Sequence, residues 1–403
     1  MPFRLLSFWR KTLEPRCRHF GTCGGCTLQH LAYEEQLRLK AGGLKEILLT
    51  ELDPRVLPEA KIVPTPDPWS YRSKMEFSFG EEKGRLTVGL HERNNFRKIV
   101  EIERCEIAPE PVSRLLVHLR RIAERFSLRS YHSRSHRGFW RHAVIRSSVT
   151  EGGLLLLLMT HEGPREPAQA LAQELPALVP ELKSFYWGIS TQASDVVRPE
   201  RLERLFGAEG LDDEVAGIRY RMGPMNFAQP NRLLFPKVYQ TLQEQAGLAG
   251  RETVYDLYCG VGILTLLLAG GAGTACGVES EPENVESAER NAVLNSRTNA
   301  TFLCGRTEDV VKRQALFRLN GPPDCVVLDP PRVGLHKEVL PPLLAARPRT
   351  LLYLSCNPAS LARDLKVILE REPAYRVESL HLFDFFPHTP HMEVLATLRY
   401  NCR

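Results

Sequence analysis

Near its C-terminal end the chain carries a cysteine at the point where an apolar run stops. The run covers residues 350–355, and Cys356, Asn357 and Pro358 follow it directly. Such a run is typical of a buried strand, and most cysteines of buried strands only pack against their neighbours. A proline cannot continue a strand ladder, so the chain must turn just after the cysteine. This position predicts a thiol that faces a ligand and can act as a nucleophile.

A second group of residues is typical of a nucleotide-like ligand. The stretch DLYCGVG contains Asp256, Tyr258 and Gly260, and its glycines allow a tight turn and close approach of the backbone to a ligand. The next predicted strand ends at Glu279, where an acid suits the hydroxyl pair of a ribose. The third glycine of a dinucleotide fingerprint is absent, because position 265 is Thr265. S-adenosylmethionine therefore fits better than NAD, and a plain tight turn without a ligand is the alternative.

Two further acids follow or begin predicted strands. Asp329 precedes two prolines that stiffen its loop and fix the direction of the carboxylate, although an ordinary strand-ending turn would look the same. Glu393 begins the last predicted strand, where a lone glutamate would usually be solvated. If a methyl group is transferred to a poor carbon nucleophile such as C5 of uracil, a thiolate must first add to C6 and a base must later remove the C5 proton. Cys356 and Glu393 would supply that nucleophile and that base.

Four cysteines have the spacing of a metal site. Cys17, Cys23 and Cys26 lie in CRHFGTCGGC, and Cys105 stands alone further along. Ten cysteines in a chain without a recognisable signal peptide favour metal binding or catalysis over disulfides. Four thiolates suit either tetrahedral zinc or a 4Fe–4S cluster, and the spacing leaves both open.

One basic segment is typical of single-stranded RNA binding. Residues 127–150 contain Arg134, Arg137 and Arg141 with interleaved aromatic residues, and this segment contains no Asp or Glu. An arginine-rich solvated loop is the alternative. The net charge of +5 and the pI of about 8.6 permit a nucleic-acid partner without requiring one.

From Cys17 to its end, the chain resembles the RNA uracil-5-methyltransferase family. The stretches that carry the resemblance are DLYCGVG, GVE, VVLDPPRVG, YLSCNPASLARDL and LFDFFPHTPHMEVL. The resemblance implies that Cys356 is the nucleophile and Glu393 the base. It also implies a set of residues around the methyl donor and the target base, namely Gln229, Tyr258, Gly260, Glu279 and Asp329.

The resemblance extends to the RNA target and to the cysteines. The branch that modifies 23S rRNA carries a 4Fe–4S cluster with this cysteine pattern, whereas the bacterial tRNA branch generally lacks one. We therefore expect the cluster and a 23S rRNA substrate, with tRNA as the alternative. Tyr71, Arg72 and Lys74 lie in a stretch similar to one that the family associates with RNA. Many members begin with a small oligonucleotide-binding barrel, which we expect to be absent because only 16 residues precede Cys17.

The elements that must position these residues are predicted from periodicity. From residue 250 onward, strands and helices alternate, which is typical of a doubly wound parallel sheet with ligands at the carboxyl ends of its strands. We predict an α/β protein with a Rossmann-like class I methyltransferase domain at 226–403. An α+β RNA-binding domain is predicted at 60–225, and a small cysteine-cluster region at 1–59.

The composition is that of a globular protein in the cytoplasm. The longest apolar run, residues 154–159, is far too short to span a bilayer, and the start of the chain lacks the apolar core of a secretion signal. We expect no membrane partner and, by default, a monomer.

Overall fold

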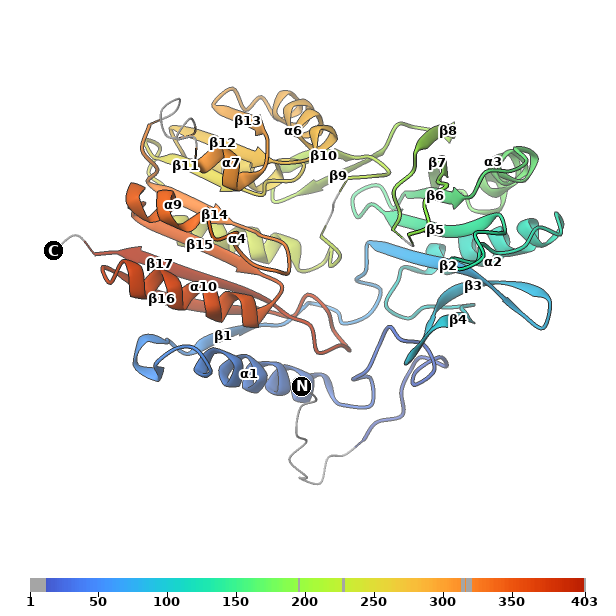
Figure 1. Ribbon diagram of the computed structural model, residues 1–403, viewed down its shortest axis with the longest axis horizontal. Coiled ribbons are helices and arrows are strands. Elements are labelled where there is room, and N and C mark those ends of the chain that lie inside the picture. The colour runs from blue at the N-terminus through green and yellow to red at the C-terminus, as the bar shows by residue number, and fades with distance from the viewer. Residues whose placement is uncertain (1–11, 195, 227–228, 313–315, 317–320, 402–403) are drawn as a thin grey trace.

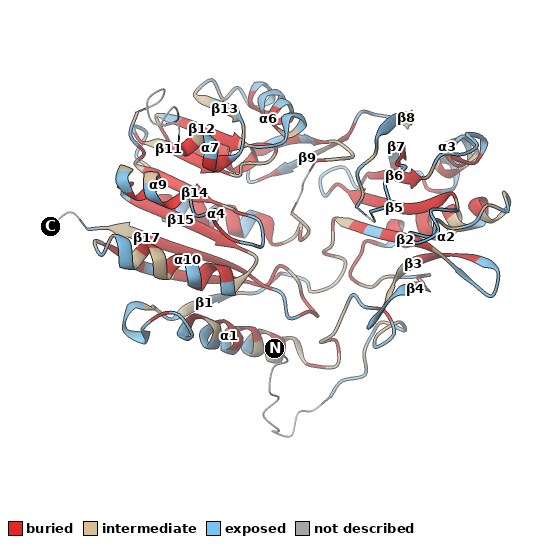
Figure 2. Cartoon of the chain, in the orientation of Figure 1, coloured by how far each residue is buried: buried red, intermediate tan, exposed pale blue. Residues whose placement is uncertain are grey.

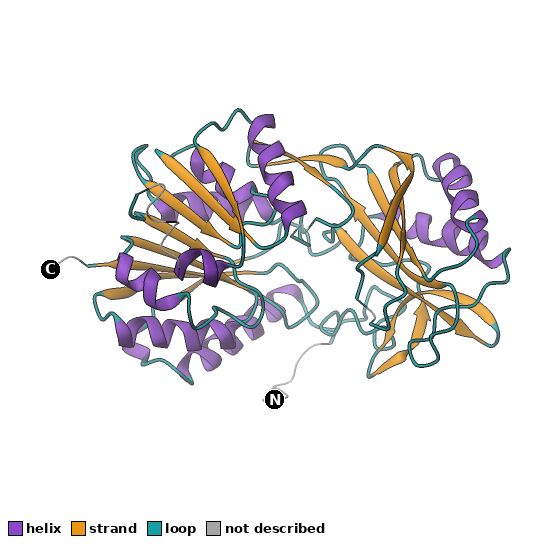
Figure 3. Cartoon of the chain, turned by 45° about the horizontal axis from the view of Figure 1, so that its top comes forward, coloured by secondary structure: helices purple, strands orange, loops and turns teal. Residues whose placement is uncertain are grey.

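Two sheet-centred units make up the computed structural model, which describes residues 12–401 except 195, 227–228, 313–315 and 317–320. Figures 1 and 3 show the two units side by side. One is built on an eight-stranded sheet and the other on a seven-stranded sheet, and a two-stranded hairpin accompanies them.

The eight-stranded sheet carries the carboxyl-terminal half of the chain. Its strands, in spatial order, are β1 (Ala60–Val63), β16 (Tyr375–Phe383), β17 (Glu393–Tyr400), β15 (Thr350–Ser355), β14 (Cys325–Leu328), β11 (Thr253–Leu257), β12 (Thr274–Glu279) and β13 (Ala300–Cys304). The strands from β11 to β15 run parallel, whereas β17 runs antiparallel to β15 and β16. Because parallel strands end at one edge, their carboxyl tips gather there.

Helices cover both faces of this sheet. One face packs against α4 (Phe235–Ala246), α5 (Ile263–Ala269) and α6 (Pro282–Leu294), and the other against α1 (Tyr33–Leu49), α7 (Thr307–Lys312), α9 (Leu340–Ala346) and α10 (Pro358–Arg371). Every residue of α5 is buried, as its sequence requires, since all of its residues except Thr265 are apolar. The carboxyl half of the chain is thus the predicted Rossmann-like layer structure.

The seven-stranded sheet is mixed. Its strands, in spatial order, are β4 (Asn95–Glu101), β3 (Arg85–Glu92), β2 (Lys74–Glu82), β5 (Trp140–Ser147), β6 (Leu154–Thr160), β7 (Leu182–Ile189) and β8 (Arg201–Gly207). Its first face packs under α2 (Glu110–Glu124) and α3 (Glu166–Leu178). Part of its second face packs against the hairpin of β9 (Leu211–Val215) and β10 (Ile218–Met222).

The run of leucines in β6 is explained by this double burial. Leu154, Leu156 and Leu158 join the core under α2 and α3. Leu155 and Leu157 point the other way, into the core shared with the hairpin and the eight-stranded unit. Figure 2 accordingly shows β5 and β6 buried throughout. A strand buried on both faces loses the alternation of apolar and polar residues.

The strand pairing departs from the domain division predicted at residue 60. Strand β1 pairs with β16, so that Ile62 lies opposite Leu382, and α1 packs on α10. Residues 33–63 therefore belong to the eight-stranded unit, although β1 is more than 300 residues from its partner strand. Within the described chain, each helix is too short or too polar to cross a bilayer.

Candidate active site

The carboxyl edge of the eight-stranded sheet opens into a cleft of about 830 Å³. All residues predicted for catalysis and for binding the donor line it: Gln229, Tyr258, Gly260, Glu279, Asp329, Cys356 and Glu393. They come from five strand ends and from the segment before α4, and residues as far apart as 229 and 393 share one wall. The predicted convergence of strand tips is therefore present.

Strand pairing sets Cys356 against Glu393. The last pair of the β15–β17 ladder joins Ser355 to Val394, so the next residue of each strand lies across the same gap. Cys356 is half-buried, whereas Glu393 is only 2% exposed. The Oε1 atom of Glu393 has no hydrogen-bond partner among the described residues. An unsatisfied buried carboxyl oxygen is rare in folded proteins, which marks Glu393 as a candidate functional residue.

The turn after Cys356 is fixed by the cap of α10. The side chain of Asn357 accepts a hydrogen bond from Ala359 N at 3.2 Å, which caps the helix. Its Nδ2 donates to the carbonyl oxygen of Arg332 at 2.8 Å. The loop that carries Cys356 is thereby fixed to the loop that follows Asp329.

Burial and mutual repulsion perturb the acids of the cleft. Burial raises the pKa of Asp256 to about 6, and burial together with Asp256 raises the pKa of Asp329 to about 7. Burial and then Asp329 raise the pKa of Glu393 well above its usual value. Burial and then Glu393 raise the pKa of Cys356 to about 11. A cationic ligand would favour the ionised carboxylates, so this group of acids suits a sulfonium.

The donor side of the cleft is organised by Glu279 at the tip of β12. One carboxylate oxygen accepts a hydrogen bond from Gly260 N at 3.0 Å, and the other accepts from Ser280 N at 2.7 Å and Glu281 N at 2.9 Å. Gly260 has open space where a side chain would be. The turn is therefore held close to Glu279 while its backbone faces the cleft.

Thr265 explains why the third glycine is missing. Its hydroxyl donates to Asp256 Oδ2 at 2.6 Å. Gly262 has a φ of +81°, and a Cβ there would lie 2.8 Å from Ala288 and Phe302. Gly262 is thus required by the backbone conformation and the close packing, whereas Thr265, at the place of the third glycine, holds the Asp256 carboxylate.

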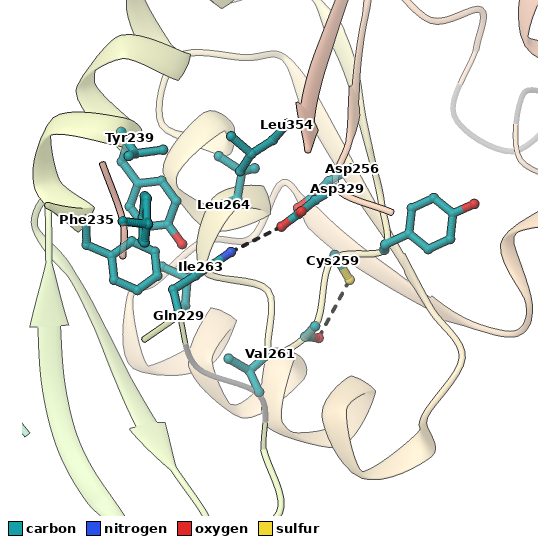
Figure 4. A pocket seen from close by; sticks show the side chains of 14 residues that line it. Gln229, Phe235, Tyr239, Asp256, Cys259, Val261, Ile263, Leu264, Asp329 and Leu354 are labelled. Atoms are coloured by element: carbon teal, nitrogen blue, oxygen red, sulfur yellow. Dashed lines mark hydrogen bonds between the residues drawn. The ribbon is translucent and has the colours of Figure 1, made fainter. Parts of the chain in front are cut away.

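A recess of about 60 Å³ continues the cleft inward (Figure 4). Gln229 Nε2 donates to Asp329 Oδ2 at 3.4 Å across its mouth. Apolar walls come from Tyr239, Ile263 and other side chains. The amide and the carboxylate together offer both a donor and an acceptor to a planar ligand.

The loop that leads to Glu393 is held by the N-terminal part of the chain. Gln36 Oε1 accepts a hydrogen bond from His388 N at 2.8 Å, and Gln36 Nε2 lies 3.2 Å from His388 Nδ1. The buried Lys40 forms an ion pair with the buried Asp384. Thr27 N and Leu28 N donate to His388 O at 2.8 Å and 2.9 Å. Helix α1 and the cysteine segment therefore position the loop that precedes the candidate base.

The four predicted cysteine ligands line one cavity of about 30 Å³. They are Cys17, Cys23, Cys26 and Cys105. Burial, with the neighbouring thiols adding to it, raises the pKa of Cys26 to about 11 and that of Cys105 to about 12. In the described part of the chain, no three His, Cys, Asp or Glu side chains form a group that could hold a metal ion. The four thiols thus line one cavity.

Two predicted RNA contacts are corrected by burial. Tyr71 is 0% exposed, and its hydroxyl donates to Pro387 O at 3.2 Å. Arg141 is 3% exposed, and its guanidinium donates to the carbonyls of residues 190, 192 and 194. A buried arginine has to satisfy its donors internally, so both side chains support the fold instead of facing RNA.

The other predicted RNA contacts divide between two places. Arg72 lines the cleft beside Cys356. Lys74 is half-buried at the start of β2. Arg134 and Arg137 are exposed and line a different cleft. The basic residues of the sequence therefore do not form one continuous group.

Sequence reasoning missed Arg332 and His391 as residues of the site. Both line the cleft, and Arg332 Nη2 lies 3.4 Å from His391 Nδ1. Arg332 lowers the pKa of both Cys356 and Glu393 against the larger upward effects. The sequence signal for Arg332 was its position directly after Asp329 and two prolines, which places it at the same strand tip.

The fold and this site define an S-adenosylmethionine-dependent methyltransferase. The crystal structure of the Pyrococcus abyssi tRNA (uracil-54, C5)-methyltransferase in complex with S-adenosyl-L-homocysteine is similar, with a TM-score of 0.76 and 29% identity. The alignment covers 93% of this chain and 85% of that one.

The family model of tRNA (uracil-5-)-methyltransferase matches residues 32–400. An uncharacterized RNA methyltransferase of Bacillus cereus is 34% identical over 97% of this chain and 84% of its own length. One of Nitratidesulfovibrio vulgaris is 35% identical over 96% of this chain and 82% of its own. The chain belongs to the RNA uracil-5-methyltransferase family and is an RNA methyltransferase that uses S-adenosylmethionine.

Proposed function

We propose that this chain methylates C5 of a uridine in RNA through a covalent bond between Cys356 and C6 of the uracil. The observation that carries the proposal is the opposition of Cys356 and Glu393 across the last pair of the β15–β17 ladder. A thiol and a separate acid are the two groups that methylation at a carbon requires.

The residues act in a defined order in this mechanism. The Cys356 thiol gives its proton to water, and its sulfur bonds to C6, which gives an enolate with nucleophilic C5. C5 then bonds to the methyl group of the S-adenosylmethionine sulfonium, the bond between that methyl group and sulfur breaks, and S-adenosylhomocysteine leaves. After methylation, the Glu393 carboxylate takes the C5 proton. The bond between sulfur and C6 then breaks, the C5–C6 double bond returns, and the thiolate leaves.

The remaining cleft residues hold the two substrates. Glu279 accepts hydrogen bonds from the ribose of the donor, and the open backbone at Gly260 lets the donor approach. Tyr258 lines the same side. Gln229 and Asp329 face the uracil edge, where an amide and a carboxylate can pair with its donor and acceptor atoms. The target base must leave its stack to enter the cleft.

We propose 23S rRNA as the substrate, supported by the four cysteines around one cavity. A second candidate is tRNA, which is favoured by the similarity to the Pyrococcus abyssi tRNA enzyme. The test is methyl transfer to unmodified 23S rRNA and, separately, to unmodified tRNA, with the product nucleosides identified by mass spectrometry. 5-Methyluridine in rRNA alone supports the first target, and in tRNA alone the second. A methylated nucleoside other than 5-methyluridine overturns the proposed reaction.

The cysteine cavity is proposed to hold a 4Fe–4S cluster on Cys17, Cys23, Cys26 and Cys105. In such a cluster each thiolate binds a different iron, so the sulfurs surround a volume instead of one point. Two buried side-chain nitrogens line this cavity: His19 Nε2 has no hydrogen-bond partner among the described residues, and the Gln29 side chain hydrogen-bonds the Cys26 thiol. With the cluster bound, these two side chains would supply N–H donors for its sulfur. Methyl transfer needs no electron, so we assign these four residues a role in shaping the segment that contacts His388.

A further inference from the structure

A second cleft, of about 650 Å³, lies on the seven-stranded unit away from Cys356. It is formed by β2, by the β3–β4 hairpin and by the loop after α2. Four exposed arginines line it: Arg97, Arg129, Arg134 and Arg137. We call this the basic cleft. Glu81 is its one acidic lining residue.

The side chains of the four arginines are unpaired within the described chain. None forms an ion pair or a side-chain hydrogen bond with another described residue, whereas other surface arginines, such as Arg165 with Glu203, are paired. Unpaired cations held close together repel one another, and an anionic partner would remove that cost. Several guanidinium groups around one hollow suit the phosphates of a polyanion.

An aromatic side chain stands beside these charges. Phe96, at the tip of the β3–β4 hairpin, lines the basic cleft and is 84% exposed. It is the most exposed large apolar side chain of the described chain. Figure 2 shows β4 with its exposed residues at the margin of the unit. A solvated phenylalanine has no role in a core, but its ring face can stack on a nucleobase.

The floor of the basic cleft connects it to the active site. Strand β2 carries buried Met75, Phe77 and Phe79 on the face under α2 and α3. Its other face is polar, and Ser78 there lies 3.3 Å from ring nitrogens of both His91 and His142. Arg72, just before β2, lines the catalytic cleft, and Ser78 lines the basic cleft. Six residues of extended chain span roughly 20 Å, so one strand links the two sites.

We propose that the basic cleft is a second RNA subsite, which holds phosphates of a single-stranded segment on its arginines and one unstacked base on Phe96. This proposal rests on the proposed RNA substrate and extends it to residues remote from the chemistry. The segment that it binds neighbours the target uridine, since the polar face of β2 leads from one cleft to the other.

The first experiment measures binding of a fluorescein-labelled oligouridylate of about 15 nucleotides, which suits site sizes of about 4–16 nucleotides. Fluorescence anisotropy is recorded over a salt series with the full chain. Replacing Arg134 and Arg137 with glutamine should weaken binding and lower the slope of log K against log salt by about 1.4, or about 0.7 for each lost phosphate contact. Replacing Phe96 with alanine should weaken binding roughly 5- to 150-fold and leave the salt slope unchanged. Phe96→Tyr should bind as the wild type does.

Matched controls keep the inference falsifiable. Arg251 and Arg371 are also exposed, and neither forms an ion pair with a described residue. Their double glutamine variant removes the same charge from the opposite edge of the eight-stranded sheet. Val293 is 82% exposed, so Val293→Ala removes a comparable apolar surface. If the Arg134 and Arg137 variant and Phe96→Ala bind no more weakly than these controls, the basic cleft is not an RNA subsite.

A second readout separates this inference from the proposed function. Oligonucleotide binding needs neither donor nor Cys356, whereas 5-methyluridine formation needs both. If the wild-type chain makes no 5-methyluridine but the cleft variants lose oligonucleotide binding, the subsite stands and the proposed function is overturned. Full activity and binding in those variants would overturn the subsite and keep the function.

Discussion

Cys356 and Glu393 face each other at the ends of antiparallel strands, one residue beyond the Ser355–Val394 pair. Burial and then Glu393 raise the pKa of Cys356 to about 11, and burial and then Asp329 raise the pKa of Glu393 well above its usual value. Predictions for these two residues, for the cysteines and for the loop before Glu393 follow from this arrangement.

Replacing Cys356 with alanine should abolish methyl transfer, because no other group at the tip of β15 can add to C6. Donor binding should remain, since the donor contacts come from the β11 and β12 tips. Incorporation of labelled methyl groups measures the first effect, and calorimetry with S-adenosylmethionine measures the second. Normal turnover in this variant would exclude the covalent route and favour transfer to a nucleophilic nitrogen.

Replacing Glu393 with glutamine should leave the covalent adduct in place. The amide keeps the size of the side chain but cannot take the C5 proton, so Cys356 cannot leave after methylation. A slower-migrating protein–RNA band on a denaturing gel is the readout. The double variant with Cys356→Ala is the control, and it should show no such band. Release of product at the wild-type rate would contradict the role of Glu393 as the base.

The reactivity of Cys356 should depend steeply on pH. Because its pKa is raised to about 11, only about one thiol in a thousand is ionised at pH 8. Alkylation by iodoacetamide should accelerate about tenfold for each pH unit between about 7 and 10. Glu393→Gln should speed alkylation, since removing the neighbouring negative charge lowers the pKa of the thiol. Mass spectrometry of the Cys356 peptide isolates this site, and a rate that is already level at pH 8 would contradict the raised pKa.

The cysteine proposal predicts a selective loss of iron. Cys105→Ser should remove most of the bound iron and sulfide, because one thiolate of the four is lost. Cys304→Ser is the matched control, since Cys304 is exposed and is not one of the residues that line the cavity. Iron and sulfide analysis of anaerobically purified protein is the measurement. Zinc without sulfide in the wild type would favour the tetrahedral alternative.

The loop before Glu393 should depend on the buried pair of Lys40 and Asp384. Lys40→Met leaves a buried carboxylate unpaired and should lower the free energy of unfolding by about 3–5 kcal/mol. Adding Asp384→Asn should recover part of this loss, because the charge is removed. The exposed Lys366–Glu51 pair is the comparison, and Lys366→Met should change the free energy of unfolding far less, because solvent screens an exposed pair. Urea unfolding followed by circular dichroism measures all three, and equal effects at both sites would contradict the assignment.

Much of the candidate site could be predicted from the sequence because it lies at strand tips. Asp329 and Cys356 each follow a short apolar run, and parallel strands must bring such ends to one edge. Glu393 begins the last strand and reaches the same edge because that strand is antiparallel to β15. The alternation of strands and helices after residue 250 is a local pattern of the same kind. Local periodicity and chain-breaking residues predict where strands and helices begin and end, and the rules of parallel strand connection then predict where the strand ends lie.

Other features were decided only by contacts between distant parts of the chain. Tyr71 and Arg141 look like RNA contacts in the sequence, but packing against Pro387 and the 190–194 segment buries them. Strand β1 pairs with β16, which lies more than 300 residues further along the chain. The sequence does not predict a role for Phe96, because only the fold shows that this side chain is exposed beside unpaired arginines. The sequence by itself determined which strand tips carry the chemistry, whereas tertiary packing decided which basic and aromatic side chains remain accessible to RNA, because exposure depends on neighbours that no local pattern encodes.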